Sequence, residues 1–148
     1  MAKILVVYFS RTGNTEKLAD SVAEGAREGG AEVMVKKAAL VTVDELVVAD
    51  AIAFGSATSW GYMGGILKDV LENMLIQARD KFGGKPYAVF ISAGAIESGR
   101  KAAESIGNIA KHFRMRSVAN DVVSKGSPSA ADREACRESG RKLARAIQ

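Results

Sequence analysis

The alternation of short apolar runs with helix-like stretches constrains the fold of this chain more than any other feature. Runs with the composition of strands lie at residues 3–9, 32–37, 51–55, 87–91 and 117–123. Apolar residues at helical spacing follow them at about residues 14–28, 43–48, 65–78, 100–113 and 130–147. Parallel strands need long crossovers, which are usually helices and nearly always right-handed. We therefore expect an α/β fold of three layers, with a doubly wound, five-stranded parallel sheet.

Chain length and composition predict one folded domain over residues 1–148. The chain is 47% hydrophobic and 26% charged, and it contains no repeat or low-complexity run. No apolar run approaches the length of a membrane span, and no secretory signal pattern is present. We expect a cytoplasmic protein that does not associate with membranes.

Two function classes are disfavoured by the residue counts. Cys136 and His112 are the only cysteine and histidine, so we expect no disulfide framework and no metal site of these ligands. The net charge of +4 raises the alternative of nucleic-acid binding. However, the basic residues of the C-terminal third alternate with acidic ones, and no aromatic residues lie among them for base stacking. We therefore expect no nucleic-acid partner.

A polar turn between the first strand and the first helix predicts an anion site. It consists of Ser10, Arg11, Thr12, Gly13, Asn14 and Thr15. A strand that turns through hydroxyl residues and a glycine into a helix directs free backbone N–H groups and the positive end of the helix dipole at one point. Simple helix capping is the alternative, but one cap does not need six such residues. We expect the turn to bind a phosphate group.

The common nucleotide-binding loops are absent. No G-x-x-x-x-G-K-[ST] occurs, and no G-x-G-x-x-G follows the first strand. A P-loop ATPase or a Rossmann dehydrogenase is therefore disfavoured.

Two further loops are expected at the same edge of the sheet, because ligands of such sheets bind outside the carboxyl ends of the strands. Residues 56–65 follow the third strand and contain Trp60 and Tyr62, either of which could cover a flat ring. Residues 92–99 follow the fourth strand. The expected ligand is a phosphate that carries an aromatic ring system.

Along nearly its whole length the chain resembles a short-chain flavodoxin. Ser10, Thr12, Gly13 and Thr15 match the phosphate-loop pattern [ST]-x-T-G-x-T of that family, and Trp60-Gly61 lies where the family places its flavin-flanking loop. The resemblance implies strand order 2-1-3-4-5, FMN as cofactor, and one-electron transfer between redox partner proteins. It assigns cofactor binding to Ser10, Arg11, Thr12, Gly13, Asn14, Thr15, Ala57, Thr58, Ser59, Trp60, Gly61, Tyr62, Ser92, Ala93, Gly94 and Gly99.

The third loop departs from the family pattern and keeps a second function open. Flavodoxins commonly place a tyrosine and acidic residues there, whereas residues 92–99 contain no aromatic residue and only Glu97 as an acid. An open flavin face suits the alternative, a flavin-dependent NAD(P)H:quinone oxidoreductase of the same fold. A third alternative, a flavin-free signalling receiver, is disfavoured because no paired acids follow the first strand.

The basic charge balance also shapes the expected partners. Flavodoxins are usually acidic and dock on basic partners, so this chain would need a partner with an acidic face. We expect docking near Lys68, Asp69, Arg100 and Lys101. A monomer is expected, with a homo-oligomer left open.

Overall fold

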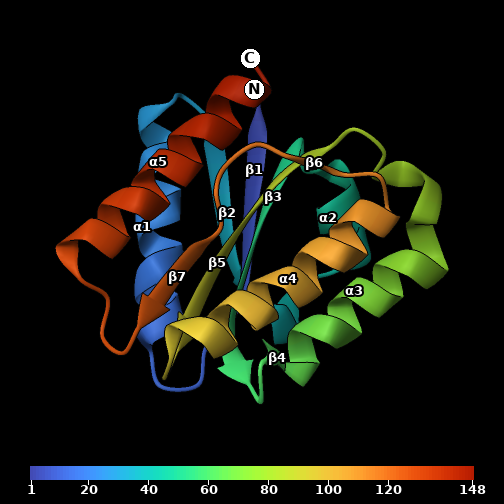
Figure 1. The fold of residues 1–148 in the computed structure, drawn as a ribbon. Coiled ribbons are helices and arrows are strands. Elements are labelled where there is room, and N and C mark those ends of the chain that lie inside the picture. The colour runs from blue at the N-terminus through green and yellow to red at the C-terminus, as the bar shows by residue number, and fades with distance from the viewer.

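A mainly parallel sheet of seven strands runs through the computed structural model, which describes residues 1–148 (Figure 1). The strands are β1 (Lys3–Phe9), β2 (Glu32–Lys37), β3 (Ala51–Ser59), β4 (Tyr62–Met63), β5 (Pro86–Ala93), β6 (Arg116–Ser117) and β7 (Val122–Lys125). The helices are α1 (Asn14–Glu28), α2 (Val43–Val48), α3 (Gly65–Ala78), α4 (Ile96–His112) and α5 (Ala130–Ala146). Short 3-10 turns occupy Ala38–Leu40 and Arg79–Lys81.

The order of the parallel strands confirms the predicted topology. The strands run β2-β1-β3-β5, and both β6 and β7 pair in parallel with β5. These five positions correspond to the expected order 2-1-3-4-5, with β4 added as an antiparallel partner of β3. The prediction of one continuous last strand over residues 117–123 is wrong. Asn120 and Asp121, residue types that are rare in strands, lie in the gap between β6 and β7.

Three predicted boundaries beside the site also differ from the structure, and the first is the end of β5, which lies at Ala93 instead of residue 91. β3 ends at Ser59 instead of residue 55, because it lies between β1 and β5 and then pairs with β4. Helix α4 begins at Ile96 instead of residue 100. Ala95 is extended and ends the preceding loop, and Glu97 places a negative charge in the positive first turn of the helix. Part of each predicted loop is therefore regular structure.

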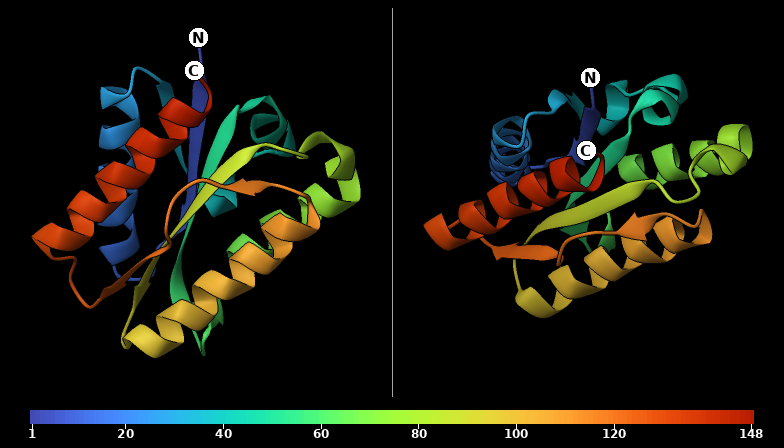
Figure 2. Two further views of the ribbon diagram at one scale, coloured as in Figure 1. Left: turned by 45° about the horizontal axis from the view of Figure 1, so that its top comes forward. Right: turned by 90° about the horizontal axis from the view of Figure 1, so that it is seen from above.

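Helices cover both faces of the sheet, as the two turned views show (Figure 2). Helices α1 and α5 pack on one face, where Leu18, Val22 and Leu143 form a core with alternate residues of β1. Helices α2, α3 and α4 form the second core on the other face. Cys136 is buried in the first core, and this burial raises the pKa of its thiol to about 12. Cys136 is therefore a packed thiol of the core.

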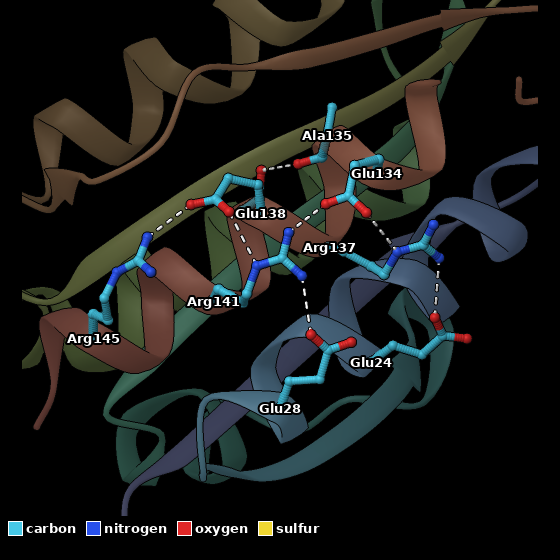
Figure 3. A network of polar contacts seen from close by, with 9 residues as sticks. Glu24, Glu28, Glu134, Ala135, Arg137, Glu138, Arg141 and Arg145 are labelled. Carbon is cyan, nitrogen blue, oxygen red and sulfur yellow. Dashed lines mark hydrogen bonds and ion pairs between the residues drawn. The ribbon is translucent and has the colours of Figure 1, made fainter. Parts of the chain in front are cut away.

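Helices α1 and α5 touch through their backbones, and ion pairs border the contact (Figure 3). A Cβ added at Gly25 of α1 would lie 1.9 Å from the carbonyl oxygen of Arg137, so only glycine fits there. Arg137 pairs with Glu24 at 3.2 Å, and Arg141 pairs with Glu28 at 3.0 Å. These exposed pairs each contribute only about 0–1 kcal/mol, so the close packing stabilises the helix pair more than the charges do.

Candidate functional site

Three loops meet at the carboxyl edge of the sheet, at the lower end of the molecule in Figure 1. The Thr15 hydroxyl, at the start of α1, lies 2.7 Å from the Ser92 hydroxyl at the end of β5. The Thr58 hydroxyl, near the end of β3, donates to the Ser92 carbonyl oxygen at 3.0 Å. Ser92 therefore joins all three loops, and the predicted convergence of these loops is confirmed.

The turn before α1 has the backbone geometry of an anion cradle. Gly13 precedes the helix with a φ of 96°, a left-handed conformation that glycine adopts without strain. No side chain caps this helix end. The first intrahelical hydrogen bond runs from the Lys17 amide to the Gly13 carbonyl at 3.2 Å. The amides of Asn14, Thr15 and Glu16 therefore have no intrahelical acceptor and can bind an anion.

The hydroxyl groups of this turn divide into structural and free ones. The Ser10 hydroxyl accepts a hydrogen bond from the Gly13 amide at 3.0 Å, which closes the turn. Thr15 is fully buried and bonded to Ser92 as described. This leaves the Thr12 hydroxyl for a ligand. The sequence predicted one role for all three hydroxyls, whereas the structure uses two of them to shape the loop.

An acidic residue at the start of α1 is held by a tyrosine. Tyr8 donates a hydrogen bond from its hydroxyl to the Glu16 carboxylate at 3.1 Å. Burial, and then the contact with Glu16, raises the pKa of Tyr8 to about 12, so the phenol stays protonated at neutral pH. The Glu16 carboxylate is therefore hydrogen-bonded to Tyr8 on the α1 side of the sheet.

The turn between β3 and β4 exposes an aromatic side chain. Trp60 and Gly61 form a two-residue hairpin loop with φ values of 53° and 74°. Positive φ at both positions suits Asn-Gly, whereas a bulky residue there is rare. The Trp60 side chain is 104% exposed relative to an extended reference, so it packs against nothing in the protein. A strained, uncovered tryptophan beside the loops indicates a binding role.

A concavity of about 600 Å³ lies beside this hairpin. Its lining residues are Thr58, Trp60, Gly61, Gly94, Ala95, Glu97, Ser98 and Lys101. Four of the predicted site residues line it, and Lys101 joins them from the second turn of α4. The Lys101 side chain passes over Gly61, since a Cβ added at Gly61 would lie 3.5 Å from the Lys101 Cδ. Lys101 was predicted only as a docking residue.

The remaining predicted site residues lie around this concavity in different ways. Arg11 donates to the Ser59 hydroxyl at 2.7 Å and lies over the Phe9 ring, which ties the first loop to the second. Ala57 and Ala93 belong to the ends of β3 and β5, and Tyr62 belongs to β4. Gly99 is buried within α4, where a Cβ would lie 2.4 Å from Val123. Its position indicates helix–sheet packing.

Comparison with known proteins identifies the family. The flavodoxin family model matches residues 6–140. A curated flavodoxin of Aquifex aeolicus is 35% identical over 97% of this chain and 86% of its own length. The chain belongs to the flavodoxin family. A solved flavodoxin from the domain Archaea superposes with a TM-score of 0.88 at 28% identity, over 98% of both chains.

A second group of relatives carries another activity. An NAD(P)H dehydrogenase (quinone) of Sinorhizobium fredii is 34% identical over 69% of this chain and 62% of its own length. This chain therefore spans less than two thirds of that relative, while it matches the flavodoxins nearly end to end. Flavodoxins bind FMN and pass electrons to redox partner proteins, and the main function predicted from the sequence is confirmed at this level.

The residues present fit FMN. The uncapped N-terminus of α1 offers three free amides and the Thr12 hydroxyl to a phosphate. The concavity beside the hairpin is lined by an exposed aromatic ring and by small residues that include Gly94 and Ala95. FMN has a phosphate group and a flat ring system, and the site offers hydrogen-bond donors for the first and a concavity with an aromatic residue for the second.

Removal of the Trp60 ring tests the aromatic wall. We expect Trp60→Ala to weaken FMN binding about 10- to 100-fold, because stacking on an aromatic side chain contributes about 1–3 kcal/mol. The stability of the apo-protein should not fall, since the ring is uncovered and its backbone is strained. Fluorescence titration with FMN and thermal unfolding measure the two effects. Trp60→Phe, which keeps a ring, should bind nearly as well as the parent, and equal weakening in both variants would contradict the stacking role.

Proposed function

We propose that this protein carries single electrons between partner proteins, with FMN held by the turn before α1, the β3–β4 hairpin and the start of α4. The observation that carries this proposal is the hydrogen-bonded junction at Ser92, which brings the phosphate cradle and the Trp60 slot to one edge of the sheet. FMN supplies reversible one-electron chemistry when it is bound.

Each part of the site has a separate task. The amides of Asn14, Thr15 and Glu16 hold the phosphate without a lysine cluster, aided by the helix dipole. Trp60, whose ring nothing else in the chain covers, would stack on the flavin ring when FMN is bound. Lys101 places a positive charge on the wall of the concavity, and this charge would stabilise the negative charge that a bound flavin gains on reduction.

We further propose that the partners present an acidic face. Lys101 lines the concavity itself, and Lys68 lies 5.8 Å from the Tyr62 ring at the nearby hairpin. Lys68 is also engaged with Glu72 at 3.3 Å, which reduces its contribution. Complementary charge steers association and mainly changes its rate. We propose the cytoplasm as the site of action.

Reversal of the charge at Lys101 tests the electrostatics of this rim. We expect Lys101→Glu to slow oxidation of the reduced holoprotein by anionic ferricyanide at low salt, and to speed oxidation by cationic hexaammineruthenium(III). Stopped-flow rates at several salt concentrations measure both, and the differences should shrink as salt screens the charges. Lys142→Glu, on α5, is the matched control and should change neither rate much. Parallel changes with both oxidants would contradict the proposal.

A direct NAD(P)H:quinone oxidoreductase is the second candidate. It is supported by the quinone-dehydrogenase relatives and by the third loop, which contributes no aromatic residue to the lining of the concavity. The two functions differ in a simple assay. We expect the FMN-loaded protein to show no steady-state oxidation of NADPH or NADH with a soluble quinone, but to accept electrons when a flavodoxin reductase is added. Turnover without the reductase would favour the second candidate.

A further inference from the structure

The outer edge of β2 is free to form hydrogen bonds. β2 ends the sheet and pairs only with β1. The Glu32 amide donates to the Ala2 carbonyl at 2.9 Å, so Glu32 and every second residue after it face β1. The N–H and C=O groups of Val33 and Val35 therefore point away from the sheet. A strand edge of this kind is a template for another strand.

The helices on the two faces of the sheet leave this edge uncovered. Val33 and Val35 lie on the α1 side and are only partly buried, so α1 stops short of the edge. On the other face α2 has only six residues, and it leaves Met34 46% exposed and Val48 59% exposed. A concavity of about 370 Å³ lies there, lined mainly by apolar residues including Leu5. Open backbone groups and exposed apolar side chains thus occur together.

We propose that a second copy of this chain docks antiparallel on β2, about a two-fold axis at Met34, to form one continuous sheet. In this register Val33 lies opposite the partner's Val35, and each such pair exchanges two backbone hydrogen bonds. Glu32 lies opposite the partner's Lys36, so each end of the paired strands gains an ion pair. Met34 meets the partner's Met34 over the apolar concavity.

Charge selects this register over the nearest alternatives. Antiparallel pairing must place outward-facing residues opposite one another, so the two nearest alternatives centre on Val33 and on Val35. In the Val33 register, Glu32 would face the partner's Met34. The Val35 register is no better. There Lys36 would face the partner's Met34, Lys37 would face the partner's Val33, and Glu32 would have no basic residue opposite. In the proposed register Lys36 stays beside Glu45 of its own chain, 2.7 Å away, and also reaches the partner's Glu32. The sequence of β2 is therefore complementary to itself in one register.

The expected dimer is weak and leaves the candidate site open. A single six-residue strand and the rim of one concavity make a small interface, which is typical of concentration-dependent association. The Trp60 concavity follows β3 and β5, on the other side of β1 from β2. The candidate sites of both copies therefore stay accessible in the dimer. Formation of the dimer does not depend on FMN binding.

A proline at Val35 tests the paired edge. The Val35 amide faces outward, so Val35→Pro removes one hydrogen bond from each of the two Val33–Val35 pairs of the dimer while it keeps the β1–β2 ladder. Sedimentation equilibrium should show a concentration-dependent dimer of the parent protein, and about tenfold or greater weakening in Val35→Pro at similar thermal stability. A parent protein that stays monomeric at high concentration, or an undiminished Val35→Pro dimer, would overturn the proposal.

Cross-linking provides a second test that does not depend on how well the proline variant folds. Met34→Cys places a thiol on the proposed two-fold axis, and it should form a disulfide-linked dimer under mild oxidation. Val48→Cys, which is also exposed but lies off the axis, is the matched control, and native Cys136 is buried. Equal cross-linking of the two variants, or none in Met34→Cys, would overturn the register.

Discussion

Gly25→Ala is expected to destabilise the protein by about 3 kcal/mol, which lowers the melting temperature by about 10 °C. The added Cβ would lie 1.9 Å from the Arg137 carbonyl oxygen. The oxygen is a backbone atom and the Cβ is fixed to the Cα of residue 25, so no rotamer change can relieve the contact, and α5 has to move from α1. That movement loosens the packing around Cys136 and Leu143. Thermal and denaturant unfolding of the parent and the variant measure the change.

Gly107→Ala is the matched control for this effect. Gly107 also lies within a helix, α4, but a Cβ there would meet only the Tyr87 hydroxyl, at an ordinary contact distance of 3.7 Å. We therefore expect Gly107→Ala to stabilise the protein by about 1 kcal/mol through helix propensity. Destabilisation of the same size in both variants would mean that the close α1–α5 contact is not what Gly25 provides.

Thr12→Asp is expected to weaken FMN binding on the order of 100-fold, or about 2.7 kcal/mol. The substitution replaces a free hydroxyl beside the uncapped amides of α1 with a carboxylate that repels the phosphate dianion and competes for the same amides. Fold stability should change little, because a negative charge near a helix N-terminus is favourable in the absence of ligand. Titration of the apo-protein with FMN, followed by fluorescence quenching, measures the affinity.

Riboflavin distinguishes an effect on phosphate binding from an effect on ring binding. It has the same ring system without the phosphate, so we expect Thr12→Asp and the parent to bind it equally. Thr12→Ser, which keeps the hydroxyl, should retain FMN affinity. Loss of riboflavin binding in Thr12→Asp would show that the substitution disturbs the whole site. Unchanged FMN affinity would show that the phosphate does not bind at this turn.

The residue pattern predicts the sheet and the phosphate turn because both depend on local sequence. The short run Val33–Val35, with charged residues on both sides, is typical of an edge strand, and the longer apolar run at the start of β3 is typical of a central one. The Ser10–Thr15 turn is recognisable because its hydroxyl residues and Gly13 stand directly before a helix. Such features need no knowledge of contacts distant in sequence.

The rest of the site depends on contacts that the sequence does not display. Ser92 joins three loops only because β1, β3 and β5 are neighbours in the sheet. The start of α4 at Ile96, one turn earlier than predicted, makes Lys101 part of the wall of the concavity. Asn120 and Asp121 divide the last strand, although the apolar residues on either side of them match the pattern of one strand.

A stepwise anaerobic reduction of the FMN-reconstituted protein, followed by visible spectroscopy, tests the proposed electron carrier most directly. We predict that the apo-protein takes up FMN and turns yellow, that dithionite reduces it in two resolved one-electron steps, and that NADPH alone leaves the spectrum unchanged. Rapid bleaching by NADPH in a single two-electron step would contradict the carrier function and favour the quinone reductase. A protein that takes up no FMN would contradict both functions.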